Sequence, residues 1–140
     1  MYYIDTSVLV AYYSPEPLSG KAEAFLLSNG RPVVSALTEV EVLSALARKV
    51  REHAMPKAEA IRIKAKFMSH VESGMYGRLT VEPHHYKLAG DWIALFKWNL
   101  RTLDALHLAI VSSEGLPIVT ADQGLAKSAA GLGLEVIRLA

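Results

Sequence analysis

The chain has 140 residues, no cysteine, and a formal charge of +1 from fifteen basic and fourteen acidic side chains. The lack of cysteine excludes disulfides, thiol nucleophiles and cysteine-ligated zinc. The near-neutral charge neither requires nor excludes nucleic acid, because binding depends on where the basic residues lie. Hydrophobic residues make up 51%, enough for a core, and no apolar run reaches the roughly 20 residues that span a bilayer. We therefore expect one domain, residues 1–140, with a cytoplasmic location.

The predicted elements alternate between short strands and helices. Strand-favouring or buried apolar runs predict strands at Tyr2–Ile4, Pro32–Ser35, Arg78–Glu82, Leu116–Thr120 and Leu134–Ile137. Apolar residues at helical spacing, with capping residues and glycine or asparagine stops, predict helices at Leu18–Ser28, Thr38–Glu52, Ala58–Val71, Pro83–Trp98, Leu103–Ser113 and Ala121–Ala130. This alternation predicts the α/β class: a three-layer α/β/α sandwich around a mostly parallel sheet.

Acidic residues recur where predicted strands end or helices begin. Asp5 ends the first strand, Asp122 follows Thr120 by two residues, and Asp104 lies in the first turn of its helix. In an open parallel sheet these positions share one edge, where ligands bind. The alternative for each acid is an ordinary place at a helix N-terminus, which the helix dipole favours by about 0.3–1 kcal/mol. For Asp5 this alternative has Thr6 or Ser7 cap a following helix.

Asp104 is the acid that the capping alternative explains least well, because most of its helix is apolar. A carboxylate entering a buried helix is costly unless it is paired or bound to a cation. Arg101 is the alternative partner. Several carboxylates in one crevice repel each other unless a cation neutralises them, and carboxylate oxygens suit Mg²⁺ or Mn²⁺. Such an ion, with room for a phosphate, activates water in many nucleases, and hydroxyls at Thr6, Ser7 and Thr120 could orient the ligands.

A fourth acid is expected in the first turn of the helix after Ser35, where Glu39 and Glu41 are both candidates. At 100° per residue the two side chains point about 160° apart. The apolar stripe of this helix lies on the Glu39 side, so helical phase favours Glu39.

Four segments together resemble the PIN-domain ribonucleases, most nearly the VapC toxins of prokaryotic toxin–antitoxin pairs. The segments are Tyr-Ile-Asp5-Thr-Ser-Val-Leu, Val-Val-Ser35-Ala-Leu-Thr-Glu-Val-Glu41, Arg101-Thr-Leu-Asp104-Ala-Leu-His-Leu-Ala109 and Val-Thr120-Ala-Asp122-Gln-Gly-Leu-Ala. The resemblance covers the whole chain and implies a PIN-like fold. Its acidic quartet, binding Mg²⁺ or Mn²⁺, corresponds to Asp5, Glu41, Asp104 and Asp122, so the resemblance selects Glu41 over Glu39. It further implies RNA cleavage by metal-activated water, a homodimer, and a VapB-type antitoxin as partner.

Other residues have an ordinary and a functional interpretation. His107 is expected to be a hydrogen-bonded structural histidine rather than a metal ligand, and His84 and His85 to lie at the surface. The aromatic residues of the 83–98 helix favour core or dimer contacts over base stacking; they are Trp92, Phe96 and Trp98. Basic residues of the two middle helices favour a solvated face over a track for the RNA backbone; they are Lys49, Arg51, Lys57, Arg62, Lys64 and Lys66. Arg101 is the best single candidate for a phosphate contact.

Two other classes of function remain open from the sequence. A receiver-like domain would use strand-end acids to bind Mg²⁺ and accept a phosphoryl group, but it needs paired acids near the first strand, where only Asp5 stands. An aspartyl phosphohydrolase would need a second acid where Ser7 stands. A non-catalytic module could hold a structural ion with the same carboxylates and bind another protein.

Overall fold

The computed structural model describes residues 1–140 and contains five strands and seven helices. The strands are β1 (Tyr2–Ile4), β2 (Pro32–Ser35), β3 (Gly77–Leu79), β4 (Ile118–Thr120) and β5 (Val136–Arg138). The helices are α1 (Thr6–Tyr13), α2 (Ser19–Ser28), α3 (Ala36–Arg51), α4 (Lys57–Glu72), α5 (Pro83–Ile93), α6 (Thr102–Glu114) and α7 (Gln123–Gly131). None of these helices is long and apolar enough to span a membrane.

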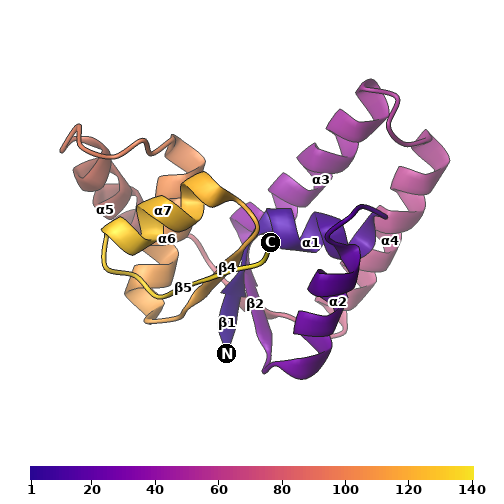
Figure 1. The fold of residues 1–140 in the computed structure, drawn as a ribbon, viewed down its shortest axis with the longest axis horizontal. Coiled ribbons are helices and arrows are strands. Elements are labelled where there is room, and N and C mark those ends of the chain that lie inside the picture. The colour runs from indigo at the N-terminus through magenta and orange to yellow at the C-terminus, as the bar shows by residue number, and fades with distance from the viewer.

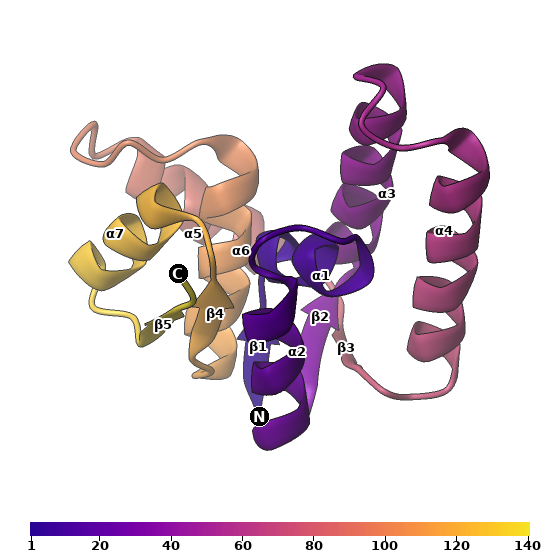
Figure 2. The same cartoon turned by 45° about the vertical axis from the view of Figure 1, so that its right-hand side comes forward.

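All neighbouring strands are parallel, in the order β3-β2-β1-β4-β5. Because β-to-β crossovers are right-handed, the chain places helices on one face as it moves from β1 to β3. It places helices on the opposite face as it moves from β3 back across the sheet to β4 and β5. Helices α1–α4 therefore cover one face and α5–α7 the other (Figures 1 and 2). This confirms the predicted three-layer α/β fold.

The two faces of the sheet bury separate cores. Tyr2 and Ile4 belong to the core formed with α1–α4. Tyr3, between them in sequence, points the other way and packs with buried residues of α6 and α7, including Leu108 and Leu125. Alternating strand residues thus supply both layers, as expected for a sheet covered on both faces.

Strand β1 lies at the centre of the sheet, with β2 on one side and β4 on the other. Strand order reverses here, because the chain builds outward from β1 to β3 and then returns to place β4 against the free edge of β1. The backbone N–H of Asp5 donates to Val119 O of β4 at 2.9 Å. In open α/β sheets, ligands bind in the crevice outside the carboxyl ends of strands at such a reversal. The fold therefore predicts a ligand-binding site at Asp5 and at the residues that follow β4.

The helix boundaries differ from the sequence predictions where tertiary contacts intervene. Helix α5 ends at Ile93 rather than Trp98, and Phe96 in the following loop has a φ of 53°, which no helix accommodates. In this loop Trp98 packs closely against Gly131 at the end of α7. Helix α3 begins two residues before the predicted Thr38, because a capping box joins Ser35 and Thr38.

The predicted surface position of His85 is wrong, whereas that of His84 is confirmed. His85 is only 2% exposed. It is the third residue of α5, and its Nδ1 accepts the backbone N–H of Glu82, which closes the N-terminus of the helix. Glu82 is therefore a helix cap, and β3 ends at Leu79 instead of continuing to Glu82 as predicted.

Candidate active site

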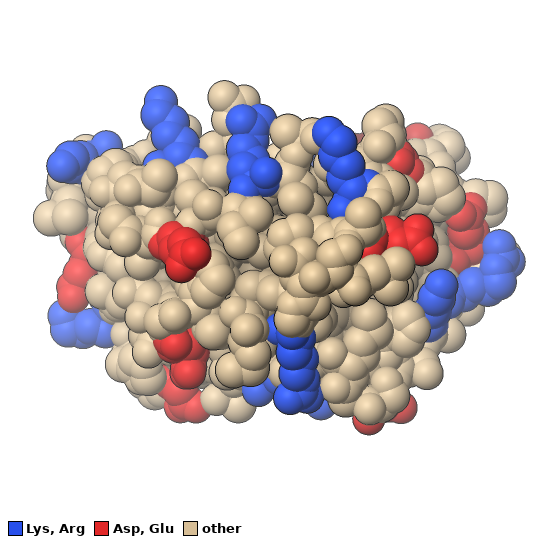
Figure 3. Space-filling view, turned by 60° about the horizontal axis from the view of Figure 1, so that its bottom comes forward, with Lys and Arg blue, Asp and Glu red and all other residues tan.

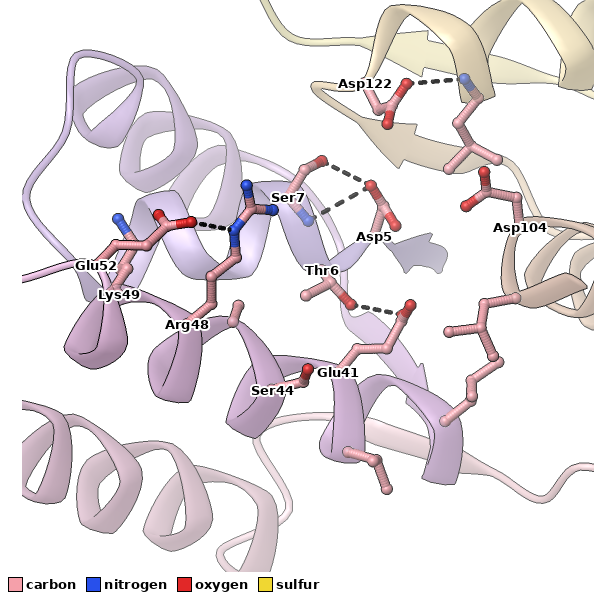
Figure 4. A pocket seen from close by; sticks show the side chains of 15 residues that line it. Asp5, Thr6, Ser7, Glu41, Ser44, Arg48, Lys49, Glu52, Asp104 and Asp122 are labelled. Carbon is pink, nitrogen blue, oxygen red and sulfur yellow. Dashed lines mark hydrogen bonds and ion pairs between the residues drawn. The ribbon is translucent and has the colours of Figure 1, made fainter. Parts of the chain in front are cut away.

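A cleft of about 700 Å³ opens at the carboxyl ends of β1 and β4. Four acidic residues line it: Asp5, Glu41, Asp104 and Asp122. They follow β1, lie in α3, begin α6 and follow β4, and Figure 4 shows the three aspartates pointing toward one another across the cleft. The structure thus brings together four carboxylates that span more than a hundred positions of the sequence.

Asp5 is the most buried of the four, with 7% of its surface exposed. It caps α1, and its Oδ2 accepts the Ser7 hydroxyl at 2.6 Å, the Thr120 hydroxyl at 2.8 Å and, more weakly, the Ser7 backbone N–H at 3.4 Å. These bonds satisfy one oxygen of a nearly buried carboxylate. Oδ1 accepts no hydrogen bond from the protein, so this oxygen remains available to a ligand.

Asp122 occupies the corresponding position after β4. It caps α7, with Oδ1 accepting the backbone N–H of Leu125 at 3.0 Å. Its own backbone N–H donates to the Thr120 hydroxyl at 3.0 Å. The hydroxyl of Thr120 therefore donates to Asp5 and accepts from Asp122, and it fixes the two strand-end acids relative to each other.

Glu41 is held from two sides through a single oxygen. Its Oε1 accepts the Thr6 hydroxyl at 3.0 Å and is also bonded to Nε2 of His107. Burial by itself raises the pKa of Glu41, but the bonds from His107 and Thr6 outweigh it, and the pKa lies below its ordinary value. Since Nδ1 of His107 is bonded to Tyr3, both ring nitrogens are engaged within the protein. His107 is thus hydrogen-bonded within the protein rather than free to bind a metal, as expected from the sequence.

Asp104 has no hydrogen-bond partner in the protein. Burial raises its pKa, and the negative charges of Asp122 and Asp5 raise it further, more than His107 and Arg101 lower it. Arg101, the alternative partner proposed from the sequence, forms no ion pair with Asp104. It lines an adjoining cavity of about 620 Å³ that shares Glu41, Asp104 and Asp122 with the cleft.

Glu39 lies outside this cleft, although helical phase favoured it. Its carboxylate forms an ion pair with Arg78 of β3, with both oxygens 2.9–3.0 Å from Nη2. The cleft is lined by the α3 face that carries Leu37, Glu41, Ser44 and Arg48, a stripe at helical spacing. That stripe is distinct from the core-facing one, so a phase argument built on the core could not identify the residue at the cleft.

The outer end of the cleft carries charged residues that the sequence reasoning did not assign to it. Arg48, Lys49 and Glu52 line it. The Nε of Arg48 is 2.9 Å from a carboxylate oxygen of Glu52, and Lys49 pairs with Glu16 at 3.3 Å. Arg48 is seven residues after Glu41, two helical turns along the same face, and this spacing was the available signal.

The carboxylates of the cleft resemble a site that holds a divalent cation partly through water. As the side chains stand, no three histidine, aspartate or glutamate residues are grouped closely enough to hold one ion. Mg²⁺, however, keeps several waters and is usually bound through one or two carboxylates together with substrate phosphates. The free oxygens of Asp5, Glu41 and Asp122, and the unpaired Asp104, provide this kind of donor. Burial first, and then the negative charges of Asp122 and Asp5, raise the pKa of Asp104, and a nearby cation would oppose this rise. The residues therefore fit a hard cation.

Comparison with known proteins agrees with this fold. The sequence model of the PIN domain matches residues 2–131. The ribonuclease VapC46 of Mycobacterium tuberculosis is 29% identical over 144 residues, which cover 96% of this chain and 95% of the relative. The crystal structure of VapC20 from the same organism, a toxin that cleaves the sarcin–ricin loop, superposes with a TM-score of 0.76 at 17% identity, covering 99% of both chains. A toxin–antitoxin complex from Klebsiella pneumoniae superposes with a TM-score of 0.67 at 17% identity, covering 100% of this chain and 98% of the other.

A parallel sheet with acidic residues gathered at the carboxyl ends of its central strands defines an α/β protein with an acidic cleft. The match over residues 2–131 then gives the family: the chain belongs to the PIN domain family.

Proposed function

We propose that the protein is a Mg²⁺- or Mn²⁺-dependent endoribonuclease, the toxin of a VapBC-type toxin–antitoxin pair, built as one PIN-like nuclease domain. The observation that carries this proposal is the convergence of four carboxylates on one cleft at the reversal point of the sheet. Membership of the PIN domain family and the likeness to a ribonuclease over nearly the whole chain support it.

Asp5, Glu41, Asp104 and Asp122 would hold the cation. When bound, such an ion lowers the pKa of a coordinated water and neutralises the charge that develops on a phosphodiester. The residues of the chain prepare the cleft for this chemistry. Thr120 and Ser7 fix Asp5 by Oδ2, and Thr6 and His107 fix Glu41 by Oε1, which leaves one oxygen of each carboxylate for binding.

Two arginines flank the carboxylates and are proposed to contact RNA phosphates. Arg48 lies at the outer end of the cleft and Arg101 lines the adjoining cavity, both exposed. By contrast, the side of the molecule on which β1 begins carries scattered charges of both signs (Figure 3). Cations beside the acids would position the scissile phosphate and compensate the repulsion between RNA and the carboxylates.

The partners follow from the same proposal. Structural relatives include a toxin–antitoxin complex and proteins of VapBC systems, which supports an antitoxin of the VapB type for this chain. We also propose a homodimer, to be checked by light scattering, and a cytoplasmic location, where RNA substrates lie. The receiver-like alternative is disfavoured, because receiver domains have the strand order 2-1-3-4-5, whereas this sheet has the order β3-β2-β1-β4-β5.

Two glutamates of α3 provide a matched test. Purified wild-type, Glu41→Gln and Glu39→Gln chains are incubated with a mixed RNA pool and Mg²⁺, with and without EDTA. Glu41→Gln should lose at least about 100-fold in cleavage rate, since it removes a charge that the cation needs. Glu39→Gln removes an equal charge outside the cleft and should cleave as wild type does.

Asp5→Asn serves as a second variant at the cleft and should also be inactive. Equal cleavage by wild type, Glu41→Gln and Asp5→Asn would remove the carboxylates from the mechanism. Absence of cleavage by the wild type, with Mg²⁺ bound, would favour the non-catalytic binding module.

A further inference from the structure

A buried chain of hydrogen bonds runs from the sheet to Glu41. The Tyr3 hydroxyl lies 2.6 Å from Nδ1 of His107, and Nε2 of His107 is bonded to Oε1 of Glu41. The Tyr3 hydroxyl also lies 2.8 Å from the Ser35 hydroxyl and 3.2 Å from the Thr38 hydroxyl. Tyr3 is 0% exposed and His107 1% exposed, so the bond between these two side chains is shielded from water, whereas Glu41 is partly exposed at the cleft.

The chemistry of the groups orients the protons along this chain. An ionised carboxylate only accepts, so His107 must donate from Nε2 to Glu41. In an imidazole that carries its one proton on Nε2, Nδ1 is an acceptor, which the Tyr3 hydroxyl satisfies as donor. The Tyr3 hydroxyl, as a neutral phenol, can donate this bond and accept others at the same time. The Tyr3 oxygen accepts hydrogen bonds from the hydroxyls of Ser35 and Thr38. The Thr38 hydroxyl oxygen in turn accepts the backbone N–H of Ser35 at 3.2 Å. Every group in the chain has a partner.

This chain of hydrogen bonds connects three elements of the cleft. It begins in β1, two residues before Asp5, and passes through α6, three residues after Asp104. It ends on Glu41 of α3, at the same oxygen that Thr6 of α1 holds from the other side. Oε2 of Glu41 accepts no hydrogen bond from the protein. The position of this free oxygen is therefore fixed relative to the elements that carry two of the other acids.

We propose that Tyr3 and His107 are positioning residues that act through Glu41: they select the Nε2–H tautomer, hold Oε1, and so direct Oε2 toward the cation of the cleft. The inference rests on the proposed nuclease function for its cation. A purely structural role for the pair would require only that the two side chains fill their buried volume, and it predicts no link to cation affinity.

The test compares full-length wild type with Tyr3→Phe, His107→Leu and His107→Gln. Tyr3→Phe removes one oxygen atom and keeps the ring, His107→Leu removes the donor to Glu41, and His107→Gln returns an amide N–H close to the position of Nε2. Ile110→Val is the control, because it removes one buried methyl group from the same helix and leaves the hydrogen-bond chain intact. Three quantities are measured: the ¹⁵N shifts of the His107 ring, the Mn²⁺ affinity by calorimetry, and kcat and KM for RNA cleavage.

We expect the wild-type spectrum to place a proton on Nε2 and none on Nδ1. Tyr3→Phe and His107→Leu should weaken Mn²⁺ binding and lower kcat by about 10- to 100-fold, the usual effect of losing a partner behind a metal ligand. KM should stay within about twofold, since RNA contacts are unchanged. His107→Gln should recover most of the loss, and Ile110→Val should match wild type.

The inference is overturned if the proton lies on Nδ1 alone, or if Tyr3→Phe keeps wild-type Mn²⁺ affinity. Tyr3→Phe decides the second point even if His107→Leu does not fold. If the wild type binds Mn²⁺ with this dependence yet cleaves no RNA, the nuclease proposal fails and the positioning role stands. If the wild type cleaves RNA but Mn²⁺ binding does not depend on Tyr3 and His107, the positioning role fails and the nuclease proposal stands. If the wild type neither binds Mn²⁺ nor cleaves RNA, both the nuclease proposal and the positioning role are rejected.

Discussion

Replacing Thr120 by valine tests how the cleft is assembled, because one hydroxyl joins the two strand-end acids. Thr120 is fully buried, donates to Asp5 at 2.8 Å and accepts the Asp122 N–H at 3.0 Å. Valine has nearly the same shape and removes both bonds. A hydrogen bond to a charged group contributes about 1.5–3 kcal/mol. Asp5 keeps the Ser7 bond, so we expect a net loss of about 2 kcal/mol in the free energy of unfolding.

For a chain of this length the average unfolding entropy converts that loss into a decrease in Tm of about 7 °C. The assay is thermal unfolding followed by circular dichroism in EDTA, with Thr120→Ser as control because serine keeps the hydroxyl and loses only a methyl group. We expect the serine variant to be the more stable of the two and to retain RNA cleavage. A valine variant that melts with wild type, while serine melts lower, would mean that packing rather than the hydroxyl secures this position.

The remaining predictions concern stability and charge. Gly131→Ala should destabilise the fold by about 1–3 kcal/mol in urea unfolding, because the added carbon would clash with ring carbons of Trp98; an unchanged midpoint would contradict this packing. Asp104→Asn should raise Tm in EDTA at neutral pH. Burial and the charges of Asp122 and Asp5 raise the pKa of Asp104, so its contribution to stability is present at low pH and is lost as pH rises through the folded-state value. The Tm gap between variant and wild type should therefore shrink toward about pH 4, and a gap independent of pH would refute the argument. Adding Mg²⁺ should raise Tm more for wild type than for Asp104→Asn, because a ligand that binds the folded state more tightly stabilises it more.

Much of the fold follows from local sequence patterns. The alternation of short apolar strands with amphipathic helices predicted the layers and the parallel sheet, and glycine correctly marked the end of α6, where Gly115 has a φ of 64°. The errors lie where a distant contact decides the boundary. Helix α5 could not be predicted to end at Ile93, because the loop that follows it is shaped by Trp98 packing against Gly131 of another helix.

The site was predictable to a similar extent. Asp5 and Asp122 could be placed at one edge because they lie one and two residues after parallel strands, which requires only the element order. Glu41 could not be separated from Glu39 by helical phase, since the cleft is built against a face of α3 other than its core stripe. The link from Glu41 to His107 joins residues 66 positions apart, and no local pattern records such a contact.

From the sequence, capping a helix and binding a cation are alternative roles for Asp5 and Asp122. In the structure one carboxylate can have both roles. Asp5 caps α1 through Oδ2 and Asp122 caps α7 through Oδ1, and in each the other oxygen accepts no bond from the protein. A cap contributes roughly 0.5–2 kcal/mol, which offsets part of the cost of gathering like charges. Asparagine retains an oxygen that can cap while removing the charge. Asp5→Asn should therefore fold with its helix intact and lose cation binding, whereas alanine would remove both and could not separate them.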